Sequence, residues 1–113
     1  DKIDDHFKRL SEMRNASEAN INRWFADFNH IWSDLIHFEP FRPLYLLLVQ
    51  REYNYVQRYW LDLRSRPNSF EKIMDTGKTI APLIGAIKRV TSYLQESFEQ
   101  LVRKLEAKYE ASH

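Results

Sequence analysis

Apolar residues recur every three or four positions along most of this 113-residue chain, which is the spacing of one face of an α-helix. No run alternates apolar and polar residues for long enough to indicate a strand, and only two glycines and four prolines interrupt the pattern. The sequence therefore predicts one all-α domain, an antiparallel helical bundle of three long helices plus a short helix, packed through coiled-coil-like seams. The helices are expected at about 2–38, 43–64, 69–77 and 79–110.

We interpret segment 44–63 as the central helix of this bundle. Two heptad rows within it are apolar at every position. These rows are Leu46, Tyr53 and Trp60, and Val49, Val56 and Leu63. Because the run 44–49 is apolar without interruption, its first turns are expected to be covered on all sides. Pro43 and Pro67 bound the helix, since a proline disfavours helical geometry in the residue before it.

The first segment, 2–38, is expected to form one long helix. Its two heptad rows are Ile3, Leu10, Ser17, Trp24 and Ile31, and Phe7, Arg14, Ile21, Phe28 and Leu35. The polar exceptions, Arg14 and Ser17, fall together, and we expect the helix to bend or change partner there. In the last segment, Gly77 and Pro82 leave two alternatives, one kinked helix or a break, of which we favour the break. The seam of the last helix is Ile80, Ile87, Leu94 and Leu101, interleaved with Ile84, Thr91, Phe98 and Leu105.

The predicted helices differ in length, at roughly 50, 30 and 40 Å for the three long ones. An up-down-up arrangement would leave the start of the first helix and the end of the last one uncovered. Both of these arms carry apolar residues, namely Ile3, Phe7, Leu10, Leu101, Val102, Leu105 and Tyr109. Since isolated helical arms are poorly stable in water, we expect a second copy or another protein to cover them and predict a homo-oligomer.

Composition and charge narrow the function classes. The chain has no cysteine, which excludes disulfides, thiolate metal sites and thiol nucleophiles. Its net charge is +1, without the large basic excess that is typical of a nucleic-acid-binding domain. The longest apolar run is far shorter than the roughly 20 residues of a membrane span, and no leader pattern precedes it. We expect a soluble, intracellular and cytoplasmic protein.

One polar pattern suggests metal chemistry. Asp27, His30, Asp34 and His37 follow one another at spacings of three, four and three residues, which places all four on one helical face. Carboxylates and imidazoles on bundle helices are the ligands of di-metal sites. However, these residues flank the apolar seam, and the other helices offer few inward-facing ligands. We interpret them as a solvated acidic face and predict no metal site and no cofactor.

The sequence lacks the signatures of a catalytic site. Gly77, Lys78 and Thr79 resemble the end of a phosphate-binding loop, but Lys72 stands where that loop requires its first glycine. No serine or threonine lies in a turn pattern typical of a nucleophile beside a histidine and a carboxylate. We therefore predict no catalytic residues and no enzymatic activity.

Aromatic residues alternate with arginines on the central helix, and this composition is typical of protein interfaces. The candidate contact residues are Tyr45, Arg51, Tyr55, Arg58 and Tyr59. The sequence predicts a non-enzymatic protein–protein interaction or assembly module, a scaffold that acts through aromatic and aliphatic helix faces. Two alternatives are association with a lipid or polymer surface through amphipathic helices and binding of single-stranded nucleic acid by stacking and charge.

Overall fold

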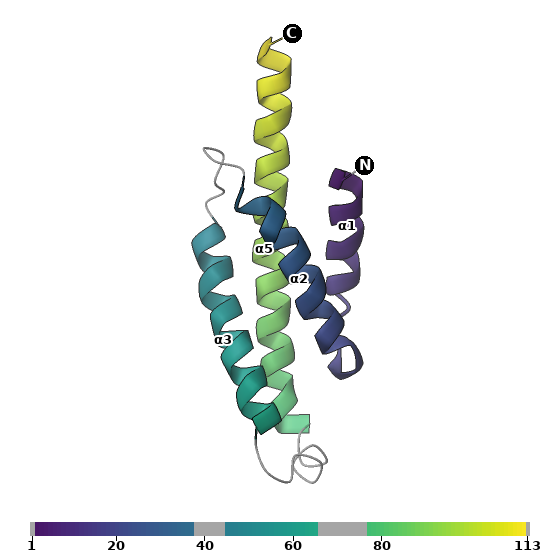
Figure 1. Cartoon of the computed structure of the whole chain (residues 1–113), viewed down its shortest axis with the longest axis vertical. Helices are drawn as coiled ribbons and strands as arrows, with labels where there is room; N and C mark the ends of the chain where they lie inside the picture. The colour runs from purple at the N-terminus through teal and green to yellow at the C-terminus, as the bar shows by residue number, and fades with distance from the viewer. Residues whose placement is uncertain (1, 38–44, 66–76, 113) are drawn as a thin grey trace.

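The computed structural model describes residues 2–37, 45–65 and 77–112, and all regular structure in these ranges is helical (Figure 1). The elements are α1 (Lys2–Met13), the short 3-10 helix η1 (Glu18–Asn20), α2 (Ile21–Leu35), α3 (Leu46–Ser65) and α5 (Gly77–Ser112). The predicted all-α helical bundle is confirmed. The predicted short helix at 69–77 lies almost wholly outside the described residues.

The helices form an elongated bundle of 61 × 23 × 18 Å, with α5 as its long axis. Figure 1 shows α1 and α3 running in one direction, and α2 and α5 running in the other. The interpretation of segment 44–63 as the central helix is wrong, because α5 is the element that packs against both α3 and α1. In the described part of the chain, no helix combines the length and the apolar character needed to cross a membrane.

The prediction of one helix over 2–38 is wrong, because the chain turns back between α1 and α2. The turn lies at the interruption of the seam near Arg14 and Ser17, where only a bend or a change of partner was expected. The backbone N–H of Ser17 donates to Asn20 Oδ1 at 2.7 Å, and the N–H of Asn20 donates to the Ser17 carbonyl at 3.1 Å. Serine and asparagine favour such turns because their neighbouring polar groups compete with the helix for backbone hydrogen bonds.

The predicted seams form the core. The most deeply buried residues come from α1, α2, α3 and α5, and include Leu10, Trp24, Phe28, Ile31, Val49, Val56, Ile87, Leu94 and Leu101. Rings from α2 and α3 stack where these two helices meet, and the centroids of Phe28 and Tyr53 lie 3.9 Å apart with the planes 5° from parallel. One polar contact crosses this core, since Trp24 Nε1 donates to Thr91 Oγ1 at 2.9 Å.

The prediction of two uncovered arms is wrong at the N-terminal end. Because α1 folds back beside α2, it also packs against the middle of α5, while the C-terminal part of α5 extends beyond all the other helices (Figure 1). The ring of Phe7 meets Phe98 edge-on at 4.9 Å, while Leu10 and Leu101 are buried. The chain thus buries Leu10 and Leu101 and half-buries Phe7, so that less of its apolar arms is left for a second copy to cover. Self-association stays a prediction. The end of α5 stays exposed, and Tyr109 is 67% exposed there.

Candidate functional site

The outer face of α3 carries large apolar side chains in contact with solvent. Leu47 is 78% exposed and Leu61 55% exposed, although the sequence pattern predicted full cover for the run 44–49. A helix turns about 100° per residue, so these leucines lie on the side of α3 opposite the buried Val49 and Val56. The outer face is defined here as Leu47, Arg51, Asn54, Tyr55, Arg58 and Leu61.

A shallow groove lies in the middle of this face. Its lining consists of Arg51, Asn54, Tyr55, Arg58 and Tyr59, so four of the five predicted contact residues come together. The rings of Tyr55 and Tyr59 form one wall, with centroids 5.9 Å apart. The exposure follows from the helical spacing, because positions 51, 55 and 58 lie on the side of α3 turned away from the core, while Tyr59 is partly buried against the core at the edge of that side. That these residues contact a partner stays a prediction.

The fifth predicted contact residue, Tyr45, lies elsewhere. Its side chain is half-buried, and its ring stacks on Tyr93 of α5 with centroids 6.1 Å apart and planes 17° from parallel. Tyr45 therefore packs between helices at the start of α3, and the structure does not bring it to the groove.

The groove on the outer face is basic. Arg51 and Arg58 line it without an acidic residue among its described lining, while the exposed Asp62 lies one helical turn after Arg58 on the same side of α3. Glu52 stands at one side, where its carboxylate lies 3.8 Å from Arg51 and 3.7 Å from Arg89 of α5. Because the Arg51 side chain is 72% exposed, this ion pair leaves the guanidinium accessible to a ligand.

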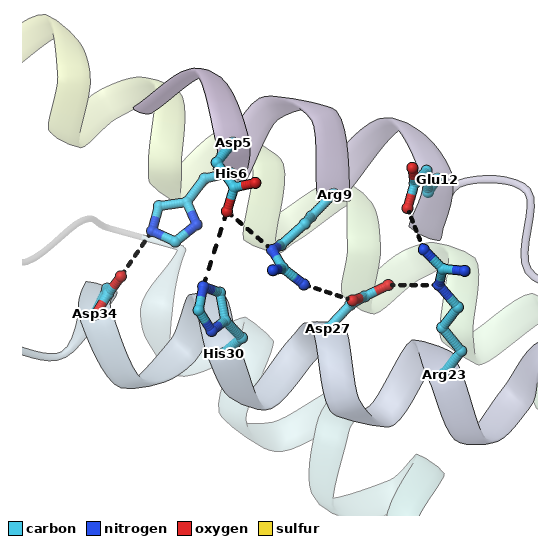
Figure 2. Close-up of polar contacts among 8 residues, drawn as sticks. All are labelled: Asp5, His6, Arg9, Glu12, Arg23, Asp27, His30 and Asp34. Carbon is cyan, nitrogen blue, oxygen red and sulfur yellow. Dashed lines mark hydrogen bonds and ion pairs between the residues drawn. The ribbon is translucent and has the colours of Figure 1, made fainter. Parts of the chain in front are cut away.

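A second polar cluster joins α1 to α2, as Figure 2 shows. Arg9 reaches from α1 to two carboxylates, donating from Nε to Asp5 and from Nη1 to Asp27, both at 3.0 Å. Arg23 of α2 reaches back and donates to Glu12 at 3.0 Å. The hydrogen bond from Arg9 lowers the pKa of Asp5 below its ordinary value, so this carboxylate is ionised at neutral pH.

His6 lies at one end of the same interface, beside Asp34, and is only 4% exposed. Its Nε2 lies 2.8 Å from Asp34 Oδ2, while its Nδ1 is buried without a hydrogen-bond partner among the described residues. In Figure 2 the Nδ1 atom of His6 points towards the space between Asp5 and His30. The Nε2 atom of His30 lies 3.9 Å from Asp5 Oδ2.

The interpretation of Asp27, His30, Asp34 and His37 as a solvated face is wrong for its first member. Asp27 is 6% exposed, because α1 lies over it. Asp34 pairs with His6, and Nδ1 of the exposed His37 lies 2.6 Å from the carbonyl oxygen of Ser33, one helical turn earlier. Sequence reasoning missed the partners from α1, because it placed 2–38 on one straight helix. The polar pair in the seam at positions 14 and 17 was the available signal.

Comparisons of the chain with models of protein families, with curated proteins and with solved structures each found no match.

Proposed function

We propose that the chain is a non-enzymatic interaction module that binds an acidic helical segment of another protein along the outer face of α3. The observation that carries this proposal is the exposure of Leu47 and Leu61 at the two ends of a groove lined by arginine and tyrosine. Exposed apolar groups with a polar rim are typical of protein interaction sites, and Tyr and Arg are frequent anchors of such interfaces.

The spacing of the two leucines defines the size of the partner. They are 14 residues apart, which corresponds to roughly 21 Å along α3. An amphipathic helix of about four turns has that length, and it would place apolar side chains at every third or fourth position against Leu47, Tyr55 and Leu61. Acidic residues beside that stripe would lie near Arg51 and Arg58, which gives the complex charge complementarity.

A second copy of the chain suits this face less well. Closed dimers use the same patch on both subunits, so a two-fold pairing along α3 would bring Arg51 and Arg58 of one copy opposite the same arginines of the other. Like charges at an interface disfavour association. We therefore propose another protein as the partner and treat self-association as an outcome of the test.

The two alternative functions, association with a lipid or polymer surface and binding of single-stranded nucleic acid, would use the residues of this face differently. A lipid or polymer surface needs a continuous apolar stripe, whereas the leucines of α3 are separated by the arginines of the groove. Single-stranded nucleic acid needs stacking rings and cations, which Tyr55, Tyr59, Arg51 and Arg58 offer, but it has no use for the exposed leucines. The leucines at both ends of the face favour a protein partner.

Selection from a display library of helical peptides, with the purified chain as target, tests the proposal. We expect enrichment of peptides that carry apolar residues at helical spacing beside Asp or Glu. Binding should weaken at least tenfold, which corresponds to about 1.4 kcal/mol or more, in Leu47→Glu and in the double variant Arg51→Glu, Arg58→Glu. The first variant places a charge in the apolar contact, and the second replaces the two cations that would face the acidic residues of the peptide. Tyr109→Ala, which changes an exposed residue on another helix, is the matched control and should bind normally.

Direct binding experiments separate the classes. Fluorescence anisotropy with a labelled thymidine 20-mer reports on nucleic acid, flotation with phosphatidylserine vesicles on lipid, and sedimentation velocity on a second copy. The proposal is contradicted if the library yields no peptide, or if the selected peptides bind Leu47→Glu as tightly as the wild type. Oligonucleotide or vesicle binding that those same variants abolish would replace it with the corresponding alternative.

A further inference from the structure

Asp5, His6 and His30 bring three metal-ligating side chains together at the interface of α1 and α2 (Figure 2). One ligand atom from each residue lies within 4.8 Å of the other two. Two of the three residues are adjacent on α1, and the third comes from α2. The group exists only because the chain folds back between these helices.

The orientation of His6 is that of a metal ligand. Its Nε2 lies 2.8 Å from Asp34 Oδ2 and donates a hydrogen bond to that carboxylate. A neutral imidazole with its proton on Nε2 presents a bare lone pair at Nδ1. That Nδ1 is buried, has no partner among the described residues and turns towards Asp5 and His30. Histidines that bind metals commonly donate their other N–H to a carboxylate in this way.

We propose that Asp5 Oδ, His6 Nδ1 and His30 Nε2 bind a divalent transition-metal ion, with Zn²⁺ as the ion that best suits this ligand set. Two imidazoles and one carboxylate are a typical three-ligand set for Zn²⁺, in which water occupies the fourth position. Ligand atoms around a tetrahedral zinc are roughly 3.3 Å apart, given bonds of about 2.0 Å. Asp5 and His30 have half-exposed side chains, so small rotations bring their atoms to that separation.

The charge of the interface favours a cation. Four carboxylates, Asp5, Glu12, Asp27 and Asp34, face two guanidinium groups, Arg9 and Arg23, which leaves a net charge of −2 with both histidines neutral. Arg9 competes with the ion for Asp5. However, Arg9 keeps its second hydrogen bond, to Asp27, when Asp5 turns towards the ion.

The bound ion would hold α1 against α2. His30 Nε2 and Asp5 Oδ2 are 3.9 Å apart and both side chains are half-exposed, so their direct contact contributes little to stability. A ligand that binds only the folded state stabilises that state, and the gain grows with the logarithm of the ligand concentration. The site is therefore inferred to be structural, a metal-dependent clamp on the helical hairpin, and it is independent of the outer face of α3.

Titration of the tag-free chain with Zn²⁺ and Co²⁺ tests the proposal. We expect one ion per chain by calorimetry, the visible absorption of tetrahedral Co²⁺, and a melting temperature that rises with Zn²⁺. His30→Ala and Asp5→Asn should each weaken binding at least about tenfold, which is the lower end of the loss seen for supporting residues of metal sites. The matched controls His37→Ala and Asp4→Asn change an exposed histidine of the same chain and a neighbouring carboxylate, and both should bind as the wild type does.

Long-range 1H–15N spectra of the histidine side chains identify the ligand atoms without changing the buried His6. On addition of Zn²⁺, the Nδ1 resonance of His6 and the Nε2 resonance of His30 should move, while those of His37 should not. The proposal is overturned if no ion binds in one-to-one proportion, if His30→Ala binds as tightly as the wild type, or if His37→Ala loses binding to the same extent.

Discussion

Single side chains in this bundle behave as their position in the heptad predicts, but their polar contacts do not follow from that position. The rows placed both Trp24 and Thr91 inside. Thr91 Oγ1 accepts a hydrogen bond from the Trp24 indole and donates one to the Ile87 carbonyl at 2.8 Å, so both buried polar groups have hydrogen-bond partners. The two partners are 67 residues apart. Spacing along one helix cannot predict such a pair, because it depends on how two helices pack.

Tyr53 provides a pH-dependent test of this packing. Burial raises the pKa of its hydroxyl above the ordinary value of 10.0, and the hydrogen bond to Asn29 opposes that rise only in part. The folded state therefore disfavours the tyrosinate, while the unfolded chain ionises at the ordinary pH. Below about pH 10 the Tyr53 hydroxyl is protonated in both the folded and the unfolded state, so it makes no pH-dependent contribution to stability. Above that pH the hydroxyl ionises more readily in the unfolded state, so the free energy of unfolding should fall as the pH rises.

We expect Tyr53→Phe to reduce this alkaline loss of stability, because phenylalanine keeps the ring that stacks on Phe28 and has no ionisable group. Urea unfolding at pH 8 and at about pH 11 measures the difference. Tyr109→Phe, at an exposed position, is the control and should lose as much stability as the wild type. Equal losses in Tyr53→Phe and the wild type would show that the hydroxyl titrates as it does in water.

At the level of elements, the sequence predicted helices correctly and their connection incorrectly. The segment of α3 followed from its uninterrupted seams and the prolines on either side. That of α5 followed from its seam, although Pro82 lies inside this helix and not at its boundary. The first segment failed because its apolar rows continue in phase across residues 14–17, so that two helices resemble one helix with a flaw. The candidate metal site was hidden for the same reason, since Asp5 and His6 meet His30 only after the chain turns back.

The α1–α2 pair can be tested at Asp27, the buried carboxylate between them. Asp27→Ala removes the acceptor for Arg9 and the partner that lies 3.8 Å from Arg23. We expect a loss of about 1.5–3 kcal/mol in the free energy of unfolding, the range for hydrogen bonds to charged groups. Asp4→Ala, on the exposed side of α1, should change it by less than about 0.5 kcal/mol. Denaturant titration measures the free energy of unfolding of both variants. Equal losses in Asp27→Ala and Asp4→Ala would mean that Asp27 does not stabilise the contact between α1 and α2.

At the level of the whole molecule, α5 determines the shape and α1 determines how much of it is covered. The predicted overhang at the end of the last helix is present, since α5 extends beyond the other helices, but the predicted first helix of about 50 Å is not, because the chain forms α1 and α2 there. A second copy and a helix of the same chain satisfy the same apolar pattern, because hydrophobic burial is not directional. Only the turn after Met13 decides between them, since it lays α1 along the upper part of α5.

Detaching α1 should therefore expose apolar surface of α5 through which two copies can associate. The double variant Phe7→Glu, Leu10→Glu places two carboxylates in the apolar contact of α1, where Phe7 meets Phe98 and Leu10 is buried. With that cover lost, the exposed apolar surface of α5 should pair with another copy, and sedimentation should show a mass that increases with protein concentration. Lys8→Glu, which adds a carboxylate on the exposed side of α1, should leave the mass distribution as in the wild type. If the double variant sediments as the wild type does, cover by α1 is not what keeps α5 from pairing.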